Sequence, residues 1–261
     1  MRDKWWDWKC MSLAQIPANL LFVSLALLLL PGGATAADFE VRSPIIDVHE
    51  LEYDSKFSRG FDRTAWRANG RAAVHEMEFG VNEWWSPAIE AEWGRQGGAN
   101  ERSQFQAFTF ENRFQLSKQG ENWADVGLFL EYERGAPTGT ANAIRFGPLF
   151  RKDIGSTTNI LDFLAVKERG PDSRRRLTYS YAWQTRWRLS EEFQPGFELY
   201  GGALEAGRST SKQHLGGPVI FGAVDLGERQ GVRYEIGYLY GLNDSTSHGI
   251  AKILVGYEYR F

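Results

Sequence analysis

Cysteine is nearly absent from this sequence, and the single residue of that type is Cys10. One cysteine cannot form an internal disulfide, and a thiolate zinc site needs several. The four histidines (His49, His75, His214 and His248) are scattered, with neither the spacing of a metal site nor a serine in a recognisable nucleophile motif. We therefore expect no catalytic residue, no metal and no cofactor, and we regard a hydrolase as the less favoured class.

Long hydrophobic runs are also scarce. The one continuous apolar stretch covers residues 20–30 (LLFVSLALLLL). Its length of about eleven residues falls well short of the roughly 20 that a membrane-spanning helix needs. Three basic residues precede it and Ala34-Thr35-Ala36 follows it, which is the layout of a secretory signal peptide cleaved after Ala36. An uncleaved anchor helix is the alternative.

This interpretation divides the chain into three parts. Residues 1–36 are expected to be the cleaved signal peptide, with translation starting at Met1 or Met11, and residues 37–44 a short periplasmic segment. Residues 45–261 are expected to form a single domain, because no linker or change of composition interrupts them.

Neither sign of charge is in clear excess. The net charge of the chain is −3, and it becomes −4 without residues 1–36, which carry three basic and two acidic side chains. A nucleic-acid-binding surface requires a basic excess, so we expect no nucleic-acid partner.

The sequence does contain segments in which apolar and polar residues alternate with a period of two. This pattern is typical of β-strands whose two faces meet different surroundings. In the last eleven residues one parity is apolar and aromatic (Ala251, Ile253, Val255, Tyr257, Tyr259 and Phe261) and the other is mostly polar. Comparable segments are expected at 45–57, 73–81, 85–93, 108–116, 124–133, 144–151, 159–168, 177–188, 193–200, 214–224, 232–240 and 251–261. We therefore predict about 12 strands, within a range of 10–14.

Short and longer connections alternate between these segments. Short turns are expected at 82–83, 117–122, 153–157, 189–192 and 226–230, and longer polar loops between the other pairs of segments. This asymmetry and an even number of strands are typical of an up-and-down transmembrane antiparallel β-barrel. A closed barrel is also the β-structure that satisfies every backbone group in hydrocarbon. A soluble sandwich that buries the apolar rows is the alternative.

The C-terminal residues, and several blocks before them, resemble known outer-membrane proteins. Tyr257, Tyr259 and Phe261 resemble the C-terminal strand signature of Gram-negative outer-membrane barrels, which implies recognition by the outer-membrane assembly machinery. The blocks FTFENRFQL (108–116), WADVGLFLEYE (123–133), FGPLFRKD (146–153) and YSYAWQTRWRL (179–189) resemble the MetA-pathway-of-phenol-degradation family of barrels. The resemblance implies a barrel and transport of small organic compounds. It carries over no functional residues.

The polar parity is expected to face the barrel interior. Its charged members form the candidate lumen charges: Glu76, Glu78, Glu90, Glu92, Glu111, Arg113, Glu131, Arg145, Arg151, Arg186, Arg188, Arg233 and Glu235. One interpretation is a pore with acidic residues on one wall and Arg on the other, with Glu78 opposite Arg186. The other is an ion-pair network that fills the interior, and glycines on the same parity would make room for long neighbouring side chains.

These observations lead to one main functional prediction. We expect an outer-membrane barrel that acts as a narrow passive channel for small organic or polar solutes and contacts outer-membrane lipid and lipopolysaccharide. A closed barrel, structural or binding a partner through its loops, is the alternative.

Overall fold

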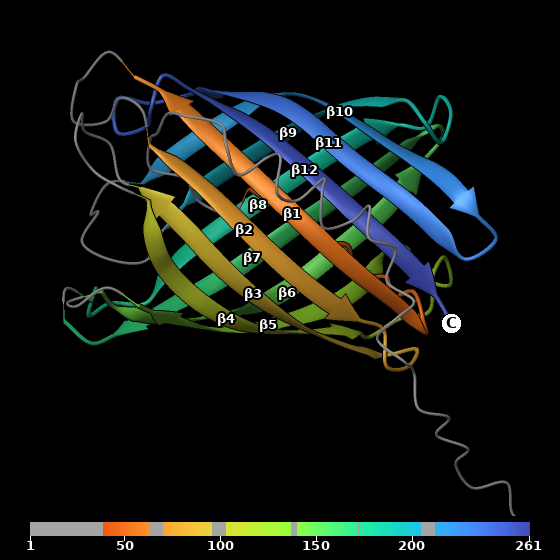
Figure 1. The fold of residues 1–261 in the computed structure, drawn as a ribbon, viewed down its shortest axis with the longest axis horizontal. Helices are drawn as coiled ribbons and strands as arrows, with labels where there is room; N and C mark the ends of the chain where they lie inside the picture. Colours follow the sequence, from red (N-terminus) through yellow and green to blue (C-terminus); the bar gives the residue numbers. More distant parts are fainter. Residues whose placement is uncertain (1–38, 63–69, 96–102, 137–139, 172, 205–211) are drawn as a thin grey trace, which may run out of the picture. The chain divides into compact units, whose positions relative to one another are not determined.

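The computed structural model describes residues 39–62, 70–95, 103–136, 140–171, 173–204 and 212–261. Twelve antiparallel strands form one meander, and β1 pairs with β12 to close the barrel (Figure 1), as predicted from the alternation. The strands are β1 (Glu50–Phe61), β2 (Arg71–Phe79), β3 (Trp85–Arg95), β4 (Gln104–Gln115), β5 (Asp125–Gly135), β6 (Asn142–Ile154), β7 (Thr157–Arg169), β8 (Thr178–Trp187), β9 (Gln194–Gly202), β10 (Gln213–Gly227), β11 (Gln230–Gly241) and β12 (Gly249–Arg260).

No helix in the described part of the chain is long and apolar enough to cross a membrane.

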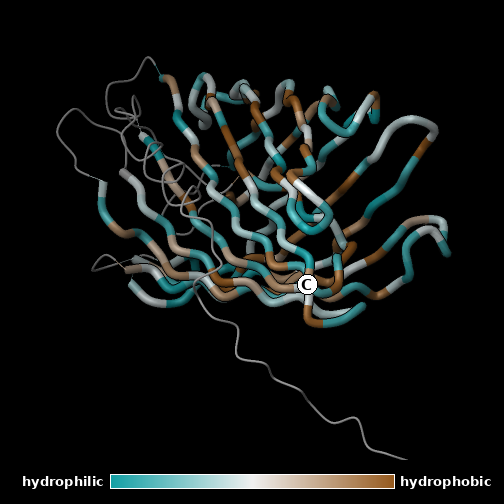
Figure 2. The backbone as a smooth tube through the Cα atoms, turned by 45° about the vertical axis from the view of Figure 1, so that its right-hand side comes forward, coloured by the Kyte–Doolittle hydropathy of each residue, from teal (hydrophilic) through white to brown (hydrophobic). Residues whose placement is uncertain are grey.

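The two faces of the barrel wall reverse the pattern of a soluble protein. On β5, for example, the outward-facing Leu130 and Tyr132 are exposed, whereas the inward-facing Phe129 and Glu131 are buried. Figure 2 shows hydrophobic and hydrophilic residues following one another along the strands. Exposed apolar rows outside and buried carboxylates inside fit a barrel that meets lipid, and they exclude the sandwich.

The connections define two ends of the barrel. We call the end where β2 joins β3, β6 joins β7 and β10 joins β11 the turn end, because these links are short, and the opposite end the loop end. The strand boundaries lie within a few residues of the expected ones, with one exception. The first strand was expected from Ile45, but β1 begins at Glu50.

The residues before β1 account for this difference. His49 has a positive φ of 61°, and its N–H donates to Gly80 O at 2.8 Å, so the chain turns sharply at the turn end. A Cβ on Gly80 would lie 2.0 Å from Asp47 O, so only glycine fits at this close approach. We call residues 39–48 the strap, because they run back between the inward-facing side chains of the barrel. The expected periplasmic segment, residues 37–44, is therefore revised where the structure describes it, since residues 39–44 contact the interior.

Candidate functional site: the strap and the charged lumen

The strap is held by inward-facing side chains of strands that are far from it in sequence. Its backbone would otherwise leave polar groups unpaired in the interior, and the barrel supplies their partners. Lys252 Nζ donates to Phe39 O (2.8 Å), Arg42 N to Asp162 Oδ2 (2.8 Å), Arg113 Nη1 to Ser43 O (3.0 Å) and Ile46 N to Gln115 Oε1 (2.8 Å). Gln115 ends β4 at the turn end, whereas Lys252 lies near the start of β12 at the loop end. The strap therefore extends through much of the lumen.

Apolar contacts also hold the strap in the lumen. Phe39 and Val41 belong to a buried cluster with inward-facing residues of β7 to β12, and the ring of Phe39 meets Tyr200 edge-on at 5.4 Å. Pro44 packs against the backbone of β5, where a Cβ on Gly127 would come within 2.9 Å of the proline Cβ. Part of the lumen is therefore packed like the core of a soluble protein.

Lys56 on β1 is the centre of the first charged cluster. Its ammonium forms ion pairs with Glu40 of the strap, with Glu76 on β2 at 2.5 Å and with Glu90 on β3 at 3.1 Å. Carboxylate oxygens of Glu40, Asp54 and Glu76 lie within 4.8 Å of one another, as in a cation site. Because Lys56 donates to two of the three, a protein ammonium already supplies the positive charge there.

Lys252 on β12 is the centre of the second cluster. Its Nζ lies 2.8 Å from Glu198 Oε2, 3.0 Å from Glu235 Oε2 and 3.3 Å from Tyr200 Oη. The residue is 3% exposed and Glu198 is 0% exposed, so this ion pair is fully enclosed. The first two clusters thus tie the strap to the wall through Glu40 and Phe39.

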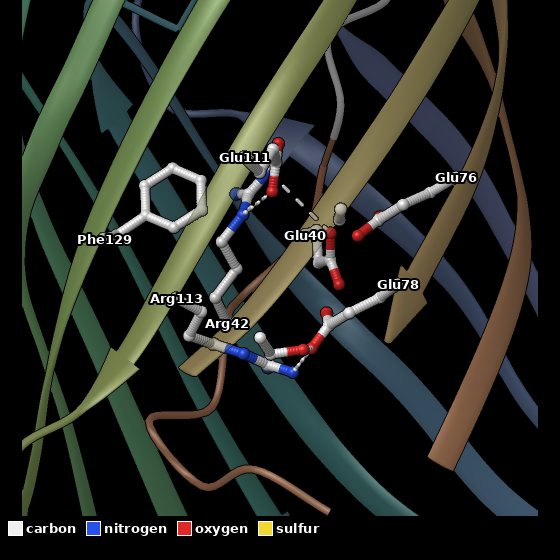
Figure 3. A pocket seen from close by; sticks show the side chains of 9 residues that line it. Glu40, Arg42, Glu76, Glu78, Glu111, Arg113 and Phe129 are labelled. Atoms are coloured by element: carbon white, nitrogen blue, oxygen red, sulfur yellow. Dashed lines mark hydrogen bonds and ion pairs between the residues drawn. The ribbon is translucent and has the colours of Figure 1, made fainter. Parts of the chain in front are cut away.

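Arg42 and Arg113 form a third group, which Figure 3 shows between β2, β4 and β5. Arg42 Nη2 bonds Glu111 Oε1 at 3.1 Å, and its guanidinium lies 4.6 Å from the centre of the Phe129 ring. Arg113 forms an ion pair with Glu78. The cavity that these side chains line has room for about one water molecule, so the side chains pack closely around Arg42.

Two further arginines form ion pairs within the wall. Arg145 on β6 pairs with Glu131 and Glu133 of β5. Arg233 on β11 reaches across β12 to pair with Glu52 and Asp54 of β1. It can do so because the strand between carries Gly256, where a Cβ would lie 2.7 Å from the Arg233 side chain and 2.3 Å from Asp54.

The structure does not assemble the expected charges into two opposed walls. Glu78 pairs with its neighbour Arg113 rather than with Arg186. Arg188 lies one residue beyond the end of β8, at the turn end of the barrel. It bonds Thr158 Oγ1 at 2.7 Å, Gly155 O at 2.5 Å and Asp153 at 3.2 Å, because the adjacent β6–β7 turn offers those acceptors.

The other predicted residues lie as follows. Tyr257, Tyr259 and Phe261 are on the outward parity, and Phe261 N donates to His49 O at 3.0 Å. Their role in assembly stays a prediction. Glu92 is partly buried at the loop end of β3. Ala34 and Ala36 lie outside the described residues.

Sequence reasoning missed several residues that organise the lumen: Glu40, Arg42, Glu52, Asp54, Lys56, Asp162, Glu198 and Lys252. Strand parity was a usable signal for some of them, since Lys252 and Glu198 lie on the polar face of strands that were located correctly. Glu40 and Arg42 gave no signal, because they belong to the strap.

Comparison with known proteins supports the fold. No protein-family model matches the sequence, and no curated protein does. An outer-membrane channel from Pseudomonas putida F1 has a TM-score of 0.61 at 9% identity, covering 87% of this chain and 99% of that chain. The translocator domain of the autotransporter NalP from Neisseria meningitidis has a TM-score of 0.54 at 11% identity, covering 95% and 96%. A KdgM porin reaches 0.49 at 13% identity, covering 81% and 99%. Structural neighbours of this chain are thus outer-membrane β-barrel proteins, and at such identities the likeness concerns the fold alone.

Proposed function

We propose that this chain is exported by a signal peptide at residues 1–36 and inserted in the outer membrane of a Gram-negative bacterium. There it acts as a narrow passive channel for small organic or polar solutes, akin to the MetA-pathway-of-phenol-degradation family. The observation that carries the proposal is a barrel interior lined by charged side chains and narrowed by a strap, with guanidinium groups of β6 and β8 left partly accessible. A charged constriction of this kind admits small solutes and excludes large ones.

The strap determines how wide the channel is. Because the cavity beside Arg42 and Glu111 has room for about one water molecule, we expect solutes to pass on the β6–β8 side or when the strap shifts. The second candidate, a closed barrel that binds a partner through its loops, is favoured by the same strap and by its enclosed ion pairs. The two candidates differ in one measurable property, which is ion flow through the folded protein.

The test is single-channel conductance of refolded residues 37–261 in a planar bilayer, beside a variant that lacks residues 37–46. Heat-modifiable migration on a gel shows beforehand that each barrel is folded. We expect small discrete steps from the first protein and larger steps from the second, because the deletion removes most of the strap. If both folded barrels are silent, the channel proposal is overturned in favour of the closed barrel.

A further inference from the structure

Arg186, on the lumen face of β8, forms no ion pair and no side-chain hydrogen bond with any residue in the described part of the chain, and its Nε is buried without a partner. It lies one residue before the end of β8, at the turn end of the barrel. A guanidinium carries five N–H donors and a fixed charge, so a buried Nε–H without an acceptor is costly, and the terminal N–H groups stay available to water or to a solute.

A second arginine faces the lumen from the neighbouring hairpin. Arg151 on β6 also has a buried Nε without a partner, and its one ion pair within the described residues is a long contact of 3.5 Å to Asp153. That carboxylate is 45% exposed and is shared with Arg188, which lies closer at 3.2 Å. Asp153 therefore neutralises the charge of Arg151 only in part, because Arg188 shares the same carboxylate.

Other carboxylates near the two arginines are engaged elsewhere. Asp125 opposes Arg151 across the β5–β6 pair, but its Oδ1 accepts the N–H of Gly120 at 2.6 Å. Glu235 acts electrostatically on Arg186, but it bonds Lys252. The nearby cation Arg233 adds to the positive potential on Arg186.

The strand register brings the two guanidinium groups to the same part of the wall. Only β7 separates β6 from β8, which places these strands about 10 Å apart. Arg151 is aligned through Ile160 with Gln184, two residues from Arg186 on the same face of β8. Both arginines exert charge on one another, and both side chains are partly exposed to the lumen.

We propose that Arg151 and Arg186 form a binding site for the carboxylate of a small organic acid at the turn end of the lumen. Guanidinium groups bind planar carboxylates through paired N–H···O bonds, and an oxyanion between them removes the uncompensated charge. The inference deepens the proposed channel function by naming its solute class, and it rests on that function for transport but not for binding. Phosphate shares the same oxyanion chemistry and is one arm of the test.

The experiment is calorimetric titration of refolded residues 37–261 in zwitterionic detergent with sodium benzoate, sodium phosphate and choline chloride. The variants are R151Q and R186Q, with R260Q as the matched control, because Arg260 ends β12 at the same end of the barrel and already pairs with Glu50. We expect benzoate binding that weakens at least about 10-fold in R151Q and R186Q and less than about 2-fold in R260Q, with no binding of choline.

Each outcome decides the inference. No benzoate binding at millimolar concentration, or equal affinities in R186Q and the unsubstituted barrel, overturns it. Phosphate binding as tight as benzoate binding, with the same dependence on the two arginines, supports an oxyanion site and overturns its restriction to carboxylates. Because binding is measured without ion flow, a silent barrel that binds benzoate refutes the channel and leaves the site standing.

Discussion

Replacing Lys252 with methionine should destabilise the barrel more than any other single loss of a β12 charge. The substitution keeps the apolar stem and removes the ammonium that bonds Glu198 Oε2, Glu235 Oε2 and Phe39 O. Two carboxylates would then share an enclosed site without their main counter-charge. Removing one partner of a buried ion pair typically costs about 3–5 kcal/mol.

The surrounding hydrogen bonds place the expected value near the lower limit of that range. Glu198 keeps two donors, the Tyr200 hydroxyl at 2.9 Å and Gln184 Nε2 at 3.3 Å, and Glu235 keeps a contact of 3.9 Å to Arg233. We therefore expect the free energy of unfolding to fall by about 3 kcal/mol at pH 8. The loss should shrink toward pH 5, because a stranded carboxylate can be neutralised by taking up a proton.

The assay is urea-induced unfolding of the barrel in lipid vesicles, followed by tryptophan fluorescence. Arg260→Met is the matched control: it removes a β12 cation that pairs with Glu50, but with a side chain 60% exposed, so a loss of about 0–1 kcal/mol is expected. Combining Lys252→Met with Glu198→Gln and Glu235→Gln should restore most of the stability, since no charge is then stranded. A loss below about 1 kcal/mol for Lys252→Met alone would refute the reasoning.

Three further predictions follow from single contacts. Gly256→Ala should cost about 1–3 kcal/mol in the same assay, since its Cβ would meet Asp54 and Arg233, whereas Gly227→Ala, with nothing within 4 Å, should be neutral. Deleting Phe261 should reduce assembly in cells, measured as heat-modifiable barrel in outer-membrane fractions, and an unchanged yield would count against the C-terminal signature. The pair Pro44→Cys and Gly127→Cys, whose Cβ atoms lie about 1 Å closer than is usual for a disulfide, should form a bond without competing thiols in residues 37–261. Oxidation should then lower the conductance reversibly if the strap moves during transport, and an unchanged conductance would show that solutes pass beside a fixed strap.

The sequence was sufficient to predict the wall of this barrel, because apolar and polar residues alternate within most strands and mark each strand independently of the others. Alternation in segments such as 124–133 and 232–240 located β5 and β11 to within three residues and assigned their lumen faces. The strand order needed no further information, since in an up-and-down meander each strand pairs with its neighbours in sequence.

The strap was not predictable in the same way. Residues 39–48 carry no period, and their partners Gln115, Asp162 and Lys252 are 69 to 213 residues away along the chain. Strand parity predicts which charged side chains face the interior, but not which of them pair with one another. Glu78 could therefore be placed in the lumen, whereas its ion pair with Arg113 could not be predicted. Arg188 was expected within the eighth strand, but β8 ends one residue earlier than its alternation suggested.

The strand number explains why a strap is present at all. Eight strands enclose a space that side chains alone can fill, and sixteen or more leave an aqueous channel. Twelve strands lie between these cases, so side chains such as Phe129 and Glu198 pack the interior only with an extra segment to pack against. The strap supplies that segment: its Glu40 and Arg42 pair with charged side chains of β1 and β4, and its Phe39 and Val41 pack against residues of β7 to β12. At the turn end of β8, Arg186 forms no ion pair and no side-chain hydrogen bond with the described residues. The filling of the barrel and the solute preference that we propose are therefore linked, because the strap pairs with lumen charges such as Lys56 and Glu111 and forms no ion pair with Arg186.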